Sequence, residues 1–312
     1  MRNLVLVHCK RFLFRWETFA VTLLNLFLGV CSTIFAVILY DPLSISYFDF
    51  NTIIYAVTVV SLCCTAAAVI FIEINTLSTG AARNLLIAGY SKAQVFLSKY
   101  IAVALFSVMQ GVIVYVPLVI ANSVTEIPVR LMVSMLLMYA AVSCILMTVC
   151  LLSDRPTVYT VIAIGFLVLC NAGGNTFSRL LAQPQYVEVN LDPDTKTLAR
   201  FDNPKYVSSP EREIIDQALC LNPVQPIFEY FEWYFQIHRP YDYHKSIQSF
   251  EMKIAESKDD NQREAIQTEM ENYKLKYGSH LNRIEVFPYY QTTFLIAFGI
   301  GGALVFRKRN LK

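Results

Sequence analysis

The chain has 312 residues, of which 55% are apolar and 16% charged, with a formal net charge of +2. Because soluble domains carry roughly 25% charged residues, this composition excludes an ordinary soluble domain and indicates a membrane protein. Seven of the eight cysteines lie in or beside apolar runs. Only Cys220 lies in the large polar region, so a disulfide within that region is excluded.

Residues 1–18 are amphipathic at helical spacing. Apolar side chains occupy one face and basic ones lie nearly opposite, namely Leu6, Cys9, Leu13 and Trp16 against His8, Arg11 and Arg15. This pattern predicts an interfacial helix at the inner headgroup surface. The alternative is a cytoplasmic extension of the first membrane span.

Six apolar runs have about the length that a bilayer core requires. They cover residues 19–40, 53–74, 95–120, 131–152, 157–171 and 290–306. The predicted fold is therefore an all-α polytopic membrane protein with six transmembrane helices. The glycine cluster at 299–302 lies in the last run and predicts close helix packing.

Twelve basic residues lie on one predicted side of the membrane. They are Arg2, Lys10, Arg11 and Arg15 before the first run, Arg83, Lys92 and Lys99 in the second loop, Arg155 in the fourth loop, and Arg307, Lys308, Arg309 and Lys312 in the tail. The first loop has none, and the third has only Arg130. Both termini, including the tail 307–312, are therefore predicted to be cytoplasmic. Since these charges follow the topology, they do not indicate nucleic-acid binding.

Polar residues inside the runs are few and uncharged at mid-span. Asn25, Gln110 and Asn171 are expected to form hydrogen bonds between helices, and the alternative is that they line a substrate path. The absence of an ionisable residue at mid-span argues against a proton-coupled or ion-coupled carrier.

Residues 172–289 form a predicted exterior domain of mixed, mostly helical structure with 13 basic and 18 acidic residues. The glycines at 171–175 predict a flexible exit from the membrane. A strand–turn–strand is expected over 186–201, and a helix from Ser209 to about Cys220. Residues 247–254 and 266–277 keep helical spacing, either as a hairpin broken near 257–262 or as one long helix.

The sequence shows no phosphate-binding loop and no hydrolase or metalloprotease motif. His238, Asp242 and His244 lie close together, but Pro240 interrupts them and their spacing is unlike that of a helical zinc site, so no metal is expected. The aromatic run at 228–235 is expected to dock the domain on its core or on the bilayer. No enzymatic activity is predicted, and active transport would need energy from another subunit.

The polar segment 73–100 reads either as an ordinary loop or as a short amphipathic helix at the membrane surface. It begins with Glu73, continues at 80–92 as Gly-Ala-Ala-Arg-Asn-Leu-Leu-Ile-Ala-Gly-Tyr-Ser-Lys, and ends with Leu-Ser-Lys at 97–99. This segment resembles that of ABC-2 type permeases of bacterial ABC exporters, including bacitracin, lantibiotic and modulin-type peptide transporters. The tail Phe-Arg-Lys-Arg-Asn-Leu-Lys at 306–312 resembles the end of that family.

The resemblance implies a coupling helix at about 80–89 that docks in a groove of a cytoplasmic ATPase. Its implied site residues are Gly80, Arg83, Asn84, Leu85, Leu86, Ile87, Gly89 and Lys92. Arg83, Asn84 and Lys92 would contact the ATPase, and the three apolar residues would pack into its groove or onto the spans. The N-terminal helix would be an elbow in the inner leaflet.

The same resemblance implies a plasma-membrane export complex of two permeases and two ATPases, surrounded by lipid. ATP and Mg would be bound by the partner ATPase, with no cofactor on this chain. The exterior domain is larger than is typical of the family, so the resemblance does not extend to the substrate beyond a peptide or amphipathic compound. The alternative function is a membrane-anchored peptide receptor or immunity factor that translocates nothing.

Overall fold

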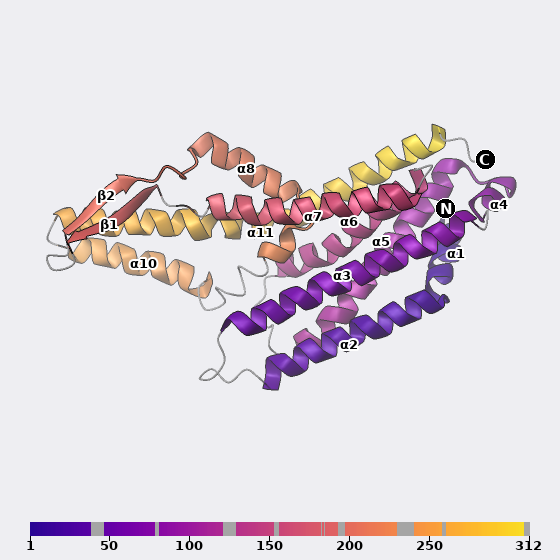
Figure 1. Cartoon of the computed structure of the whole chain (residues 1–312), viewed down its shortest axis with the longest axis horizontal. Coiled ribbons are helices and arrows are strands. Elements are labelled where there is room, and N and C mark those ends of the chain that lie inside the picture. The colour runs from indigo at the N-terminus through magenta and orange to yellow at the C-terminus, as the bar shows by residue number, and fades with distance from the viewer. Residues whose placement is uncertain are drawn as a thin grey trace.

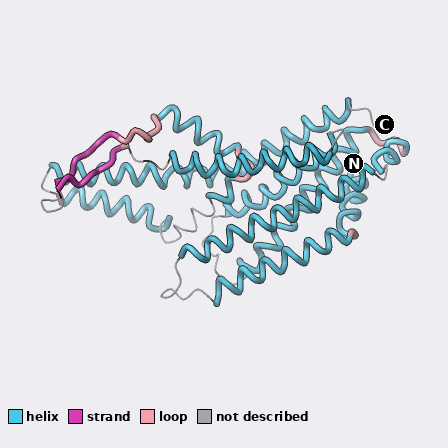
Figure 2. Tube along the Cα trace, viewed as in Figure 1, coloured by secondary structure: helices cyan, strands magenta, loops and turns pink. Residues whose placement is uncertain are grey.

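A computed structural model describes residues 1–38, 47–78, 81–120, 129–152, 156–181, 183, 185–192, 197–229, 240–257 and 260–308. These residues are almost entirely helical (Figure 2). The helices are α1 (Arg2–Leu13), α2 (Trp16–Ile38), α3 (Tyr47–Ser78), α4 (Ala81–Ile87), α5 (Lys92–Ile120), α6 (Val129–Leu152), α7 (Pro156–Leu181), α8 (Ser209–Leu221), α10 (Pro240–Glu256) and α11 (Asp260–Lys308). One antiparallel hairpin pairs β1 (Tyr186–Asp192) with β2 (Thr197–Asp202).

The molecule is elongated, with a helical bundle at one end and a thinner extension at the other (Figure 1). Both ends of the described chain and α4 lie at the same end of the bundle, whereas the hairpin and α10 lie at the opposite end (Figure 1). This arrangement agrees with the expectation that the termini and the 73–100 segment share one side. That this side is the cytoplasm stays a prediction.

Five described segments are long and apolar enough to cross a membrane. They are Trp16–Ile34, Tyr55–Thr76, Lys92–Pro117, Val129–Leu152 and Asn282–Lys308. The predicted run at 157–171 lies within α7 and is not among them. The structure therefore supports an all-α polytopic protein, and the count of six spans stays a prediction.

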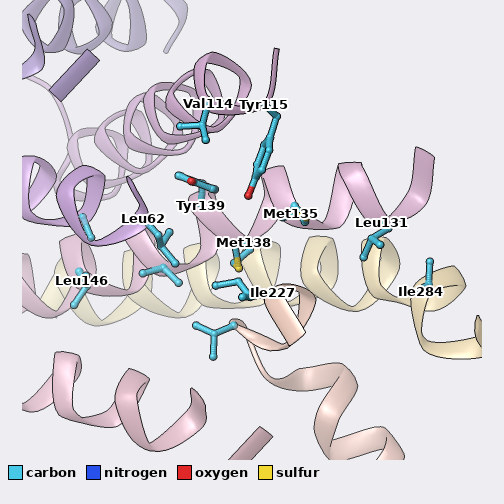
Figure 3. Packing of buried hydrophobic residues seen from close by; sticks show 13 residues of the cluster. Leu62, Val114, Tyr115, Leu131, Met135, Met138, Tyr139, Leu146, Ile227 and Ile284 are labelled. Carbon is cyan, nitrogen blue, oxygen red and sulfur yellow. The ribbon is translucent and has the colours of Figure 1, made fainter. Parts of the chain in front are cut away.

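α6 is the central helix of the bundle, and α3, α5, α7 and α11 pack around it. The residues that fill this core come from segments far apart in the sequence, such as Val114, Tyr139, Ile227 and Ile284 (Figure 3). The prediction of close packing at 299–302 is confirmed at Gly302, where a Cβ atom would lie 2.4 Å from the Phe96 ring.

The extension follows the predicted local signals. The strand–turn–strand is confirmed as β1 and β2, and 247–254 and 266–277 fall on two separate helices, α10 and α11. The rings of Phe250 and Tyr273 pack 5.7 Å apart between them. α8 begins where expected, although its N-cap is Ser208 rather than Ser209, and Glu211 accepts hydrogen bonds from the Ser208 backbone N–H and hydroxyl.

The prediction of a flexible exit at 171–175 was wrong, because α7 continues as a helix to Leu181. Gly174 does not provide flexibility. It allows α7 and Gln225 to approach each other closely, since a Cβ at this position would lie 2.5 Å from Gln225 Oε1. α11 also runs without a break across the predicted boundary at 289–290. The extension and the bundle therefore share continuous helices.

Candidate coupling surface

The segment between α3 and α5 contains a helix, as the second interpretation of residues 73–100 proposed. α4 covers Ala81–Ile87, and Gly80 lies outside the described residues. Arg83 and Asn84 are exposed, and Ile87 is 76% exposed although it is apolar. Leu85 and Leu86 are half-buried and Lys92 begins α5. α4 thus presents a mixed polar and apolar surface to its surroundings.

Hydrogen bonds fix both the end of α4 and the start of α5. Gly89 adopts φ +92°, a left-handed conformation that favours glycine. The Gly89 N–H donates to the Leu86 carbonyl, and the Tyr90 N–H donates to the Leu85 carbonyl, which is the Schellman arrangement that ends a helix. The next helix then starts with a reciprocal cap, in which Ser91 and Gln94 each accept a hydrogen bond from the other's backbone N–H.

Beneath α4 lies a buried ion pair that the sequence interpretation missed. Lys99 Nζ is 2.6 Å from Glu73 Oε2, and the two side chains are 1% and 2% exposed. The prediction placed Lys99 among the cations of the second loop, and this was wrong because Lys99 lies in α5 against α3. The sequence did contain a signal for this ion pair, because Glu73 and Lys99 each lie within a predicted apolar run, where a charge is costly unless it is paired.

α1 covers this ion pair. Its buried residues are Leu4, His8 and Phe12, and the Phe12 ring stacks on Phe106 of α5 at 5.4 Å. His8 lies opposite the Leu6 and Leu13 stripe, as predicted, but it is 3% exposed and faces the protein. Burial, followed by the positive charges of Lys99 and Arg11, lowers the pKa of His8 from 6.5 to about 4.

The other predicted face of α1 is left open by the protein. Leu6 is 49% exposed, Leu13 is 53% exposed, and Trp16 at the start of α2 is 73% exposed. Such an apolar surface suits contact with lipid. The two faces together are consistent with an interfacial elbow helix that docks on the bundle by one side.

Two of the three predicted path-lining residues are hydrogen-bonded to each other inside the bundle. Asn25 Nδ2 donates to Gln110 Oε1 at 2.9 Å and to Thr65 Oγ1 at 3.1 Å. Gln110 Nε2 donates to Thr22 Oγ1 at 2.9 Å, and both amide side chains are fully buried. These contacts favour the interhelical interpretation. Asn171 is half-buried on α7, which packs against α6 and α8.

A second buried charge cluster links α8, α11 and the 222–229 segment, and it was also missed. Arg283 Nε of α11 donates to Glu229 Oε1 at 2.8 Å, and Arg283 Nη1 contacts Asp216 of α8. Gln225 Nε2 donates to the same Glu229 oxygen at 2.9 Å and to Ser178 Oγ of α7 at 3.0 Å. α7, α8, α11 and the 222–229 segment therefore meet in one polar seam.

A polar pocket of about 500 Å³ lies between the hairpin and α11. Its lining residues include the carboxylates Asp202, Glu264 and Glu271 and no basic residue. Most of the predicted docking run at 228–235 and the side chains of the excluded metal set at 238–244 lie outside the described residues.

No family model, curated protein or solved structure matches this chain. The resemblance carried by residues 73–99 and 306–312 therefore stays a prediction.

Proposed function

We propose that this chain is the membrane subunit of an ATP-driven ABC exporter that moves a peptide or another amphipathic compound out of a bacterial cell. The observation that supports this best is α4, a short helix with a defined C-terminal cap between two long apolar helices. It exposes a cation, an amide and a large apolar side chain: Arg83, Asn84 and Ile87. A groove on another protein with an acidic rim and an apolar floor is complementary to this surface.

In this proposal, the energy comes from a partner that binds ATP with Mg and hydrolyses it. Closure of two such ATPases would push on α4 in each of two permease chains. α4 packs against α3 and α5, so the push would pass directly into two apolar helices of the bundle. A rigid-body movement of packed helices is a common way to switch a transporter between inward-open and outward-open states.

The test is co-purification of the full chain with an ATPase encoded beside it. Arg83→Glu and Ile87→Asp should each reduce the recovered complex and the stimulation of ATP hydrolysis by about tenfold or more, as expected for a charged or apolar residue at the centre of an interface. The matched control is Lys253→Glu, an exposed charge reversal on α10 at the far end of the molecule. An unchanged complex and unchanged stimulation in both α4 variants would refute the coupling assignment.

The same purification distinguishes a transporter subunit from a membrane-anchored receptor or immunity factor. A transporter subunit retains the ATPase and transports candidate peptides in vesicles. A receptor or immunity factor retains no ATPase and captures peptide through its exterior part without moving it.

A further inference from the structure

The Glu73–Lys99 pair lies where charges are costly. Removing two charges from water carries a desolvation penalty of several kcal/mol for each ion, and their attraction repays it only with close geometry. The pair has that geometry, with 2.6 Å between the charged atoms and almost no exposure. Apolar residues of similar size could hold α3 against α5 without this penalty, so adhesion alone does not explain the pair.

The position of the pair in the chain suggests what it does. Glu73 lies near the end of α3, and Lys99 lies at the start of the third turn of α5. After Glu73 the chain completes α3 at Ser78, forms α4, and starts α5 before it reaches Lys99. The pair therefore links α3, which precedes α4, to α5, which follows it. It fixes the register of α3 against α5.

The connection between α4 and Lys99 is also fixed by hydrogen bonds. The left-handed Gly89 ends α4, and the reciprocal cap of Ser91 and Gln94 starts α5 two turns before Lys99. On the other side, Thr76 donates its hydroxyl hydrogen to the Ile72 carbonyl in the last turns of α3. The hydrogen bonds between α4 and α5 leave α4 little freedom to turn relative to Lys99.

α1 lies close to the pair. It packs on α5 through Phe12 and Phe106, and its Arg11 and His8 lie within the electrostatic influence of Glu73 and Lys99 respectively. Because the low local dielectric strengthens a matched pair and penalises an unmatched one, the cover makes the paired arrangement much more favourable than any alternative.

We propose that Glu73 and Lys99 are positioning residues that clamp α4 in one orientation, with α1 as the cover that keeps the clamp dry. This inference rests on the proposed function, in which α4 receives the push of an ATPase. The clamp makes α1, α3, α4 and α5 one stiff unit at this end of the bundle. A push on α4 then moves α3 and α5 with it, because α4 cannot bend away from them.

The test uses hydrogen–deuterium exchange of the purified full chain in lipid nanodiscs, without any ATPase. Lys99→Met and Glu73→Gln should each accelerate exchange of the amides at 83–90 by about tenfold or more, the equivalent of about 1.4 kcal/mol of local opening. The charge-swapped chain, Glu73→Lys with Lys99→Glu, should recover at least part of the protection. The matched control is Arg130→Met, which removes an exposed ion pair with Glu285 that spans 3.3 Å.

A doubly neutral chain, Glu73→Gln with Lys99→Met, separates positioning from simple stability. Since replacing both partners of a buried pair is often nearly neutral, its melting temperature should stay close to that of the wild type, while exchange at 83–90 remains fast. Unchanged exchange at 83–90 in both single variants, or an equal rise throughout the bundle, would overturn the clamp. Loss of ATPase binding would not affect these readouts, so the two proposals fail separately.

Discussion

The charge cluster at Arg283 gives the sharpest prediction about stability. Arg283→Met removes the cation but leaves Glu229, which is fully buried, and Asp216, whose side chain is 33% exposed. Removing one partner of a buried pair costs about 3–5 kcal/mol, because the other charge is left without compensation. We expect a value near the lower end, since water reaches Asp216 and Gln225 still donates to Glu229.

The loss should be local, because the cluster joins α7, α8 and α11. Hydrogen–deuterium exchange in nanodiscs should show faster exchange in α8 and in residues 222–229, with little change in α3 and α5. The double variant Arg283→Met with Glu229→Gln should recover much of the protection, since no fully buried charge then remains unpaired. A cost for Arg283→Met no larger than the roughly 0.5 kcal/mol expected for breaking an exposed pair would refute this reasoning.

Three further predictions concern other parts of the fold. Gly174→Ala should lower the melting temperature in detergent by several degrees, because its Cβ would lie 2.5 Å from a buried carboxamide oxygen, whereas Gly173→Ala, with only a contact at 3.9 Å, should not. Gln110→Leu removes two interhelical hydrogen bonds and should cost about 1 kcal/mol, measured as resistance to unfolding in SDS. The lowered pKa of His8 means that the undocked α1 binds a proton more readily than the docked α1. Docking should therefore weaken as the pH falls from about 6.5 toward 4, by roughly 3 kcal/mol at most. Limited proteolysis of α1 should follow that window, and His8→Leu should abolish the dependence.

Local signals predicted the elements that local chemistry determines. Glycine at 89 ended a helix, the Asp-Pro-Asp sequence at 192–194 separated two strands, and the polar stretch near 257–262 separated two helices. In each case, the residues that decide the conformation are neighbours in the sequence. Five of the six apolar runs coincide with helices long and apolar enough to cross a membrane, because the length of an apolar run is also a local signal.

The interactions that hold the elements together were not predictable in this way. Asp216 and Glu229 lie 67 and 54 residues from Arg283, and no local pattern pairs them. Gly174 shows the opposite difficulty, because the same residue type signals flexibility in a loop and close approach in a packed helix. Only the fold, which brings Gln225 against α7, separates the two meanings.

If α4 is pushed as we propose, the two charge clusters lie at positions that affect how the movement passes through the molecule. α11 has 49 residues, which corresponds to roughly 70 Å of helix, and it runs from the extension into the bundle. Within the bundle it is tied to α5, where the Tyr100 hydroxyl donates to the Leu295 carbonyl at 2.9 Å. Pro288 lies between Arg283 and Leu295, and because it cannot donate a backbone hydrogen bond it weakens the helix between these two contacts.

Arg283 lies just over one turn before that proline and is bonded to α8 and to the 222–229 segment. The cluster therefore braces α11 before Pro288, as the Tyr100 contact does after it. If α4 is pushed as we propose, a movement that passes through α5 to α11 can reach the extension in two ways. It either turns α11 and the extension together, or it bends α11 at Pro288. Faster exchange in α8 and in residues 222–229 of Arg283→Met would show that the cluster provides this brace.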